Sequence, residues 1–439
     1  MRTKLCGAML TTTLILGMAG AGLAAGASAG SDPAIPDGTI ITTRNWQAYK
    51  GYLSDGLQGA FAGLSQVFHV SAAAQVEVGP FVPYLPPRQF FDNTEKYSKQ
   101  VRLVRADTGS YNIQGYVAGE PFPNISAQDP LAGYKVFYDI YYDYAPAAHF
   151  QINPFILDMD RYQNVITHSS ILISYRMMHL SDIGYPVDLP GNSGVLQTTY
   201  SEIMVPEQSK YTTALNLAWS DPNRFPESYI FLPSLRRALR LSSAARCAPF
   251  QGQDFTNDDV PVPQPPVWFQ AKFLERKKML WMVFSPDPAS MKRSADYTNN
   301  YYHPLLWPKR SLGKWQLRDT YVIELQRLPQ FAEGYCYSKR KMYMDAATTA
   351  QMAWDTWDSA GRQWRSELPF TMPEPVPKGG YSLNPGWSHV DIDFQNQHIS
   401  VLVPGPDPVH EILINSEIPS EYINYARYGT PAGLAQVMQ

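Results

Sequence analysis

Residues Tyr335–Phe370 read as three strands joined by two short turns, and this meander constrains the fold more than any other segment. Thr, Tyr, Trp and long amphipathic side chains fill the strand stretches, which suits a half-buried pleated surface. Asp345 opens a four-residue turn that ends at Thr348. Asp358 and Gly361 stand at the first and fourth positions of a type I turn. The segment therefore predicts antiparallel β-structure.

The same alternation of strand-forming and turn-forming residues recurs from about residue 98 onward. It predicts further strands, separated by turns with Pro and Gly, at Lys99–Val104, Tyr111–Val117, Lys135–Tyr144, Ser169–His179, Val195–Met204, Tyr211–Trp219, Tyr229–Leu232, Trp315–Gln326 and His389–Asp393. Strands at this spacing are typical of a sandwich, a barrel or a strongly curved sheet. A short helix is predicted near the end of the chain, at Glu421–Tyr428.

A helix is also predicted before the strands, because Thr43 can cap a segment that carries Trp46, Tyr49 and Leu53 at spacings of three and four. A second helical segment follows around Phe61. Two interpretations remain open: the helix packs on the core, or it lies over the mouth of the sheet as a lid. Under the second interpretation Trp46, Tyr49 and Phe61 are candidate ligand-binding residues.

The first 29 residues have the pattern of a secretory signal peptide. Arg2 and Lys4 precede an apolar stretch at Leu10–Leu23, and small residues lead up to Ala29. The alternative is a transmembrane helix, but the stretch is short and interrupted by Gly for a span of about 20 apolar residues. We expect cleavage after Ala29 and one β domain over residues 30–439.

The cysteines support export without a lipid anchor. Cys6 precedes the apolar stretch and is discarded with the signal, so the mature protein is expected to be untethered in the periplasm. Cys247 and Cys336 remain, and in an oxidising compartment such a pair predicts a disulfide. The alternative is two separate buried thiols.

Composition excludes some classes of function. The net charge of −3 becomes −5 once Arg2 and Lys4 are removed, and this acidity argues against nucleic-acid binding. Charged residues make up only 17% of the chain and aromatic residues 13%, which supplies material for a large core or a cavity lining. No Ser/Gly linker or charge run divides the chain.

Catalytic and metal-binding motifs do not occur in the sequence. Gly191–Val195 resembles a nucleophile elbow but lacks its final Gly, and no HExxH or CxxC pattern is present. Asp391 and Asp393 stand two apart on one face of a predicted strand. Glycosidases use a pair of carboxyl groups for catalysis. Neighbours on one strand are more often solvated, so we predict neither an enzyme, a metal site nor a cofactor.

A basic cluster is the best polar candidate for a ligand site, and it contributes Arg236, Arg237 and Arg240. Guanidinium groups could bind a phosphate or carboxylate head group, or an acidic partner surface. The structural alternative, which we favour, is ion pairing with carboxylates downstream: Asp254, Asp258 and Asp259.

Several motifs occur in an order that matches a known family: Asn45-Trp46-x-x-Tyr49, Glu95-Lys-Tyr97-Ser98, Tyr116-Val-Ala-Gly-Glu-Pro-Phe-Pro-Asn124-Ile125, Phe231-Leu-Pro-Ser-Leu-Arg-Arg-Ala-Leu-Arg240, Ala245-Arg-Cys247, Asp254-Phe255, Asp258-Asp259, Trp268 and Leu274-Glu-Arg-Lys-Lys-Met279. Over nearly the whole mature chain they resemble the bacterial domain-of-unknown-function family 1329, whose members are commonly labelled outer-membrane lipoprotein-sorting proteins. The closing meander is also similar to the strand pairs of LolA- and LolB-type lipoprotein carriers. The chain departs from the family pattern at Ser234, where Gly is usual, and in having Cys247 and Cys336.

The resemblance implies a fold and a function. The implied fold is mainly β: a large curved antiparallel sheet, an incomplete barrel, with helices covering the concave face. The implied function is a periplasmic carrier or chaperone that holds a lipid or other hydrophobic molecule in an apolar cavity. Its expected partners are an inner-membrane exporter of the resistance-nodulation-division type and an outer-membrane protein. An exported hydrolase acting on esters or glycans, and a non-catalytic structural subunit of an envelope complex, are the alternatives.

Overall fold

The computed structural model describes residues 35–70, 74–151, 155–242, 247, 249, 252–256, 258–259, 264–285, 301–302, 306–383, 389–403 and 412–438. The chain divides into two units, Met1–Ile35 and Pro36–Gln439, and the account below concerns the second. The predicted signal peptide and its cleavage site lie outside the described residues and stay predictions.

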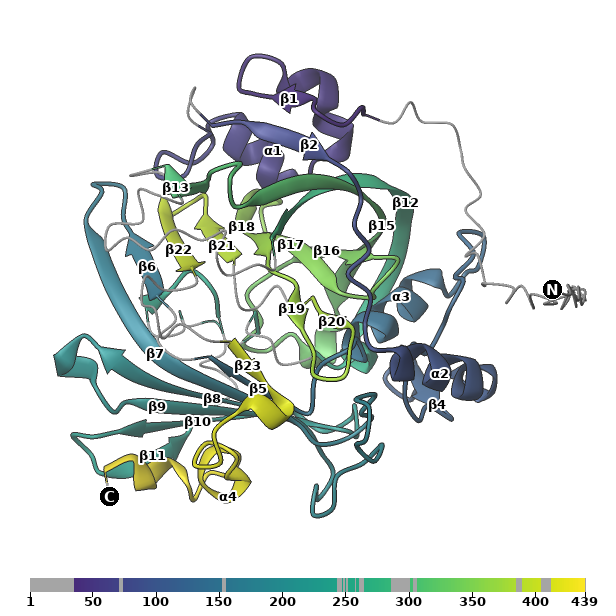
Figure 1. The fold of residues 1–439 in the computed structure, drawn as a ribbon, viewed down its shortest axis with the longest axis vertical. Helices are drawn as coiled ribbons and strands as arrows, with labels where there is room; N and C mark the ends of the chain where they lie inside the picture. Colours follow the sequence, from purple (N-terminus) through teal and green to yellow (C-terminus); the bar gives the residue numbers. More distant parts are fainter. Residues whose placement is uncertain are drawn as a thin grey trace, which may run out of the picture. The chain divides into compact units, whose positions relative to one another are not determined.

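A single large sheet dominates Pro36–Gln439, and within the described residues it has 17 strands (Figure 1). These are β1 (Ile40–Ile41), β2 (Val76–Gly79), β5 (Ala148–Gln151), β6 (Phe155–Met159), β7 (Val165–Arg176), β8 (Val195–Val205), β9 (Thr213–Trp219), β10 (Glu227–Leu232), β11 (Arg237–Arg240), β12 (Phe269–Phe284), β15 (Gly313–Arg327), β16 (Lys339–Asp345), β17 (Gln351–Trp357), β18 (Gln363–Thr371), β21 (His389–Asp393), β22 (His398–Val403) and β23 (Ile412–Ile414). Small two-stranded sheets are formed by β3 (Arg102–Arg105) with β4 (Tyr111–Gln114), β13 (Tyr301–Tyr302) with β14 (Trp307–Pro308), and β19 (Glu374–Pro375) with β20 (Tyr381–Ser382).

Helices are few in the described part of the chain. The α-helices are α1 (Asp55–Phe61), α2 (Arg88–Tyr97), α3 (Ala132–Tyr141) and α4 (Tyr425–Tyr428). Short 3-10 helices are η1 (Trp46–Tyr52), η2 (Ser98–Gln100), η3 (Glu207–Ser209), η6 (Pro266–Trp268), η8 (Pro329–Phe331), η10 (Asn415–Glu417) and η11 (Leu434–Met438).

Strand pairing confirms the predicted large, mostly antiparallel sheet. Antiparallel pairs run from β12 through β15, β16, β17 and β18, and a parallel contact between Met282 and Phe370 brings β12 back to β18. A second parallel contact joins β15 to β2. From β18 the sheet continues through β21, β22, β6, β7, β8, β9 and β10 to β11. The sheet therefore forms a ring of pairings at one end and stays open at the other.

The meander that the sequence predicted is present as β16, β17 and β18. The backbone N–H of Gly361 donates to the carbonyl of Asp358 at 3.0 Å, and Gly361 has a φ of 75°, which closes the second turn as expected. In the first turn the Thr348 hydroxyl donates to Asp345 Oδ2 at 2.7 Å. Local turn chemistry thus fixes the register of these strands.

The predicted strand at Lys135–Tyr144 is wrong, because this segment forms α3. Of the ten residues of α3, all except Lys135 are buried. A helix buried on every side shows no polar stripe at a spacing of 3.6 residues, so its aromatic and β-branched residues resembled a strand. The helix is the element around which the large sheet bends.

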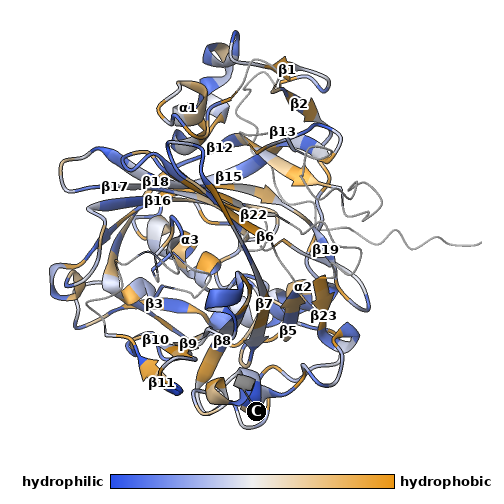
Figure 2. Cartoon of the chain, turned by 90° about the vertical axis from the view of Figure 1, so that its left-hand side faces the viewer, coloured by the Kyte–Doolittle hydropathy of each residue, from blue (hydrophilic) through white to orange (hydrophobic). Residues whose placement is uncertain are grey.

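The large sheet contacts α3 with strands from both of its ends. One apolar cluster joins Tyr138 of α3 to Ile323, Met342 and Trp354 on β15, β16 and β17, and to Ala218 on β9. Figure 2 shows α3 between β15–β18 on one side and β7–β10 on the other. We call the sheet face that contacts α3 the inner face.

The opposite face, called the outer face, has its own apolar clusters. Tyr343 of β16 and Ala353 of β17 lie there with Trp281 of β12, and they are direct neighbours of the α3-facing residues Met342 and Trp354. On the wing formed by β5 and β7–β10, the outer face packs against Tyr428 of α4 and Leu434 of η11.

Candidate functional site

The apolar part of the inner face is lined by aromatic, Met and aliphatic side chains and is occupied by α3. Phe137 and Tyr138 of α3 are 2% and 0% exposed, and Trp354 beneath them is 1% exposed. The Tyr141 hydroxyl donates to the carbonyl of Trp219 at 3.2 Å, which ties the end of α3 to β9. The protein's own side chains thus fill the space between α3 and the strands that contact it.

The helix belongs to a segment that is not part of the large sheet. Residues Arg88–Tyr141 contain α2, the β3–β4 hairpin and α3, and none of these elements pairs with a strand of the large sheet. We call Arg88–Tyr141 the cover segment. It is held by contacts such as the hydrogen bond from Ser110 Oγ to the carbonyl of Phe269, at 2.8 Å. Its removal would leave the strand pairing of the sheet intact.

The cover segment also carries two interacting carboxyl groups, of which Asp139 is fully buried and Glu120 is half-buried. Burial raises the pKa of Glu120 to about 7. Burial and the negative charge of Glu120 raise the pKa of Asp139 well above its usual range, although Asp139 Oδ1 accepts a hydrogen bond from the Phe122 N–H at 2.9 Å. These carboxyl groups therefore favour the protonated form while α3 is docked.

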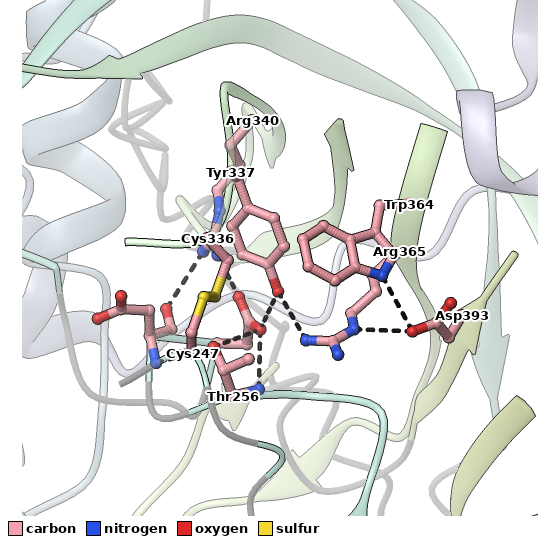
Figure 3. Close-up of a disulfide and its surroundings, with 10 residues drawn as sticks. Cys247, Thr256, Cys336, Tyr337, Arg340, Trp364, Arg365 and Asp393 are labelled. Atoms are coloured by element: carbon pink, nitrogen blue, oxygen red, sulfur yellow. Dashed lines mark hydrogen bonds and ion pairs between the residues drawn. A yellow bond between two sulfur atoms is a disulfide. The ribbon is translucent and has the colours of Figure 1, made fainter. Parts of the chain in front are cut away.

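A polar belt crosses the rest of the inner face and begins beside a disulfide (Figure 3). The disulfide joins Cys247 to Cys336, with Cα atoms 5.4 Å apart. Next to it the Tyr337 hydroxyl donates to Asp259 Oδ2 at 2.6 Å. Asp259 also pairs with Arg340, and their side chains are 0% and 5% exposed. The disulfide therefore anchors the segment that carries Asp259 against β16.

The belt continues through Tyr337 to the neighbouring strands. Arg365 Nη1 donates to the Tyr337 hydroxyl at 3.3 Å, and Arg365 Nε pairs with Asp393 Oδ2 at 3.2 Å. The Trp364 ring N–H donates to the same carboxylate oxygen of Asp393 (Figure 3). Charges that are this deeply buried are stable only when paired, and each of these has a partner of opposite sign.

Two histidine–carboxylate pairs end the belt, and a serine hydroxyl connects them. His398 Nδ1 lies 2.6 Å from Asp254 Oδ2, and His168 Nε2 lies 2.8 Å from Asp158 Oδ2. Ser400 Oγ donates to Asp158 Oδ1 at 2.5 Å and lies 3.1 Å from Asp254 Oδ2. The hydroxyl thus contacts both carboxylates.

This arrangement does not match that of a nucleophilic serine. A catalytic serine gives its proton to a histidine nitrogen. Here the Ser400 hydroxyl donates to a carboxylate instead, and His398 forms a hydrogen bond with Asp254. Burial raises the pKa of Asp254 to about 6, and the hydrogen bond with Asp254 raises the pKa of His398. Ser400, His398 and Asp254 therefore do not form a triad.

The predicted solvation of Asp391 and Asp393 is wrong. Both side chains lie in the belt and are 0% and 1% exposed. The pairing register explains the burial, because Asp393 lies opposite Arg365 and Asp391 lies opposite Ser400 on β22. Their spacing of two residues did place them on one face, as expected, but that face is the interior.

The predicted ligand-binding aromatics lie away from α3. Trp46 of η1 and Phe61 of α1 are buried and stack on each other with ring centroids 5.7 Å apart, while Tyr49 is half-buried. The same helix α1 packs on the outer face, where a Cβ on Gly56 would lie 2.5 Å from Ser366 Cβ. This position favours the core interpretation over the lid, and a binding role for these residues stays a prediction.

The predicted arginines lie on the hairpin of β10 and β11, where Arg236, Arg237 and Arg240 are exposed. For Asp254 and Asp259 the expected pairing is wrong, because Asp254 pairs with His398 and Asp259 pairs with Arg340. Arg240 instead lies 3.5 Å from Glu227 of β10. The structure therefore does not bring these arginines together with the predicted aromatics, which lie at the other end of the sheet (Figure 1).

The family of the chain follows from its sequence. The sequence model of the family described as "Protein of unknown function (DUF1329)" matches residues 40–411. The chain belongs to this family. The match spans the cover segment, the polar belt and nearly all of the sheet, so the inner face is a feature of the family region.

Solved structures with a related fold include three crystal structures that each share 12% sequence identity with the chain. A candidate outer membrane lipoprotein-sorting protein domain from Vibrio parahaemolyticus aligns with a TM-score of 0.45 over 68% of this chain and 98% of its own. A DUF1329 family protein from Desulfovibrio piger ATCC 29098 aligns with a TM-score of 0.46 over 69% of this chain and 100% of its own. A LolA superfamily protein from Nitrosomonas europaea aligns with a TM-score of 0.37 over 66% of this chain and 97% of its own. No curated protein matches the sequence significantly.

Within the described ranges, no group of three or more His, Cys, Asp or Glu side chains is placed to hold a metal ion. No described helix is both long and apolar enough to cross a membrane.

Sequence reasoning missed the main residues of this DUF1329 inner face. Arg340, Arg365 and Tyr337 gave no signal, because isolated charges on strands usually face solvent. Their best signal was indirect: Arg365 stands between Trp364 and Ser366 in a segment already recognised as a strand. An Arg inside such a strand is compatible with a buried ion pair. The spacing of the residues alone does not show where that ion pair lies.

Proposed function

We propose that this protein carries a hydrophobic molecule, which binds to the inner face in the place that α3 occupies. The observation that supports this most strongly is the position of the cover segment. It masks a continuous apolar surface that strands from both ends of the sheet contribute, yet it has no strand pairing with the large sheet. A cover of this kind can leave while its binding surface stays folded.

The chemistry of the masked surface suits an apolar guest. Its strand residues include Ile323, Leu325, Met342, Met344 and Trp354, and Met side chains adapt their shape to different guests. Each methylene that a guest buries contributes about 0.8 kcal/mol, so one acyl chain could replace the contacts that α3 gives up. The guest then needs no directional contact to bind.

Binding would proceed by exchange of α3 for the guest. When α3 leaves, its buried aromatic residues lose their contacts, and Glu120 and Asp139 gain water and release protons at neutral pH. The incoming guest restores the apolar contacts on the sheet. Since both states bury the same strand surface, the free-energy difference between them can be small enough for reversible loading.

The disulfide favours export of the mature chain to an oxidising compartment, and the periplasm is the location we propose. A carrier there would receive its guest from an inner-membrane exporter and deliver it toward the outer membrane. The exporter of the resistance-nodulation-division type and the outer-membrane protein are the partners that we propose for these two steps.

The direct test is to purify the protein under mild conditions and analyse solvent extracts by mass spectrometry. We expect a lipid or other hydrophobic molecule at close to one copy per chain. An unrelated exported protein, purified in parallel from the same cells, controls for carry-over. Repeated preparations with no more hydrophobic material than this control would contradict the carrier function.

A further inference from the structure

Buried polar side chains lie on β5 and on the hairpin of β19 and β20, which a contact between His149 and Glu374 joins. Gln151 of β5 is 0% exposed, and neither its amide nitrogen nor its amide oxygen has a hydrogen-bond partner among the described residues. The same holds for the Ser382 hydroxyl, which is 0% exposed, and for Glu374 Oε1. Polar atoms that are buried this deeply almost always have partners.

The strand geometry places these side chains around the contact between His149 and Glu374. Gln151 and His149 are two residues apart on β5 and so point to the same face. His149 Nε2 lies 2.8 Å from Glu374 Oε2, and Ser382 lies directly opposite Glu374 in the small hairpin. Side chains of directly opposed residues share a face, so Ser382 and Glu374 both face β5.

The patch lies on the inner face, where the cover segment also lies. Residues that lie opposite one another on paired strands share a face. His149 lies opposite Ser174 on β7, and the pairing continues across β8 to the face of β9 on which Ala218 packs against α3. The hairpin is fixed in place, because Val376 packs in a cluster with Phe90 of the cover segment. The unpartnered atoms therefore lie in a defined position on the same sheet face as the proposed binding surface.

The hydrogen-bonding capacity of the patch defines what would complement it. The Gln151 amide offers both donors and an acceptor, the Ser382 hydroxyl offers one of each, and Glu374 Oε1 offers an acceptor. A group with both an O–H or N–H and an oxygen acceptor satisfies this set. Hydroxyl and amide groups have this chemistry, whereas a bare hydrocarbon or an ester lacks a donor.

We propose that Gln151, Ser382 and Glu374 form a subsite for a hydroxyl or amide head group of the guest, whose apolar part lies on the surface beneath α3. This inference rests on the proposed carrier function and makes the cargo an amphiphile with an uncharged, hydrogen-bonding head group. Bound water has the same hydrogen-bonding chemistry, and the experiment separates the two sources.

The test compares two probes of equal chain length: a monoacylglycerol, which carries free hydroxyls, and the corresponding fatty-acid methyl ester, which has no donor. We expect the parent protein to bind the monoacylglycerol about tenfold more tightly than the ester. Gln151→Met keeps the side-chain volume and should abolish this preference. Ser382→Ala should weaken the preference severalfold, and it serves as a second variant if Gln151→Met folds poorly.

The matched control is Thr198→Val. Thr198 is 0% exposed and its hydroxyl also lacks a partner, but it lies between Tyr175 and Leu217 in the apolar cluster of the outer face. This variant should keep the preference of the parent protein. Equal affinities of the parent protein for both probes, or a preference that survives in Gln151→Met and Ser382→Ala, would overturn the subsite and leave bound water as the partner. Binding of neither probe would overturn the carrier function as well.

Discussion

Gly133 of α3 lies so close to Ala271 of β12 that an added Cβ would be 2.6 Å from the Ala271 carbonyl oxygen. The same Cβ would be 2.6 Å from the backbone nitrogen of Phe273, next to the register shift between Phe273 and Glu275. Only glycine allows a backbone approach of this kind. The contact sets how deeply the cover segment docks on the sheet.

Replacing Gly133 with Ala should therefore push α3 away from β12. We expect the free energy of unfolding to fall by about 1–3 kcal/mol, because the Cβ meets backbone that cannot move aside. Binding of an apolar fluorescent probe should increase as the inner face becomes accessible. Gly51→Ala is the matched control, since its Cβ would meet nothing within 4 Å. Equal effects of the two substitutions in thermal unfolding would contradict this role of Gly133.

Removing one member of the buried ion pair should be far more damaging than removing an exposed one. Arg340→Ala leaves the Asp259 carboxylate buried without its cation and should lower the free energy of unfolding by about 3–5 kcal/mol. Arg362→Ala breaks a pair with Asp358 in which the arginine is 71% exposed. This substitution should change the free energy of unfolding by less than about 1 kcal/mol. Denaturant titrations of both variants measure the difference.

Stability should fall as the pH rises from 5 to 8. Burial, with the negative charge of Asp55, raises the pKa of Asp355 to about 7, so the folded chain holds a proton that the unfolded chain has released. The stability from a raised carboxyl pKa is present at low pH and is lost as the pH rises through that pKa. Burial likewise raises the pKa of Asp143 and of Glu120 to about 7. His179 acts in the opposite sense, because burial lowers its pKa to about 4.

The substitution Asp355→Asn tests the origin of this pH dependence. It removes the titrating group, so the midpoint of thermal unfolding should fall less between pH 5 and pH 8 than in the parent protein. Asp358→Asn is the control, because the backbone N–H of Arg362 lowers the pKa of Asp358 and keeps it ionised over this range. A pH dependence that is unchanged in Asp355→Asn would show that other groups cause it.

The disulfide should contribute several kcal/mol to stability. It closes a loop with a sequence separation of 89 residues, for which the chain-entropy estimate is about 4–5 kcal/mol. We expect a lower unfolding midpoint after reduction, and the same loss in a variant with both Cys247→Ser and Cys336→Ser. If reduction has no effect on the midpoint, the anchored segment that carries Asp259 is held by its ion pairs alone.

The parts of the fold that local chemistry determines could be predicted from the sequence. The β16–β18 meander was predicted because its turns use Asp and Gly at positions that favour a reversal of the chain. The strand β21 was predicted with its observed bounds, His389–Asp393. In contrast β12 (Phe269–Phe284) was missed, because the charged run in its middle conceals the strand pattern.

Features that depend on distant contacts could not be predicted. The strands that bury α3 are far away from it in the sequence, and the residues of α3 alone do not indicate that it is a buried helix. Likewise Arg340 and Arg236 look alike in the sequence, yet one is buried in an ion pair and the other is exposed at a hairpin turn. The candidate site was therefore predicted as a kind of surface, an apolar lining within a sheet, but not as a set of residues.

Photo-crosslinking at Trp354 in the living cell tests whether the inner face holds a hydrophobic guest. A photoreactive benzoylphenylalanine at Trp354 lies on the inner face beneath α3, and the same group at Trp281 lies in the buried cluster of the outer face. We expect irradiation to attach a hydrophobic small molecule at position 354 and none at position 281, as read from the intact mass. Attachment at neither position, or equally at both, would contradict the claim that the inner face holds the guest.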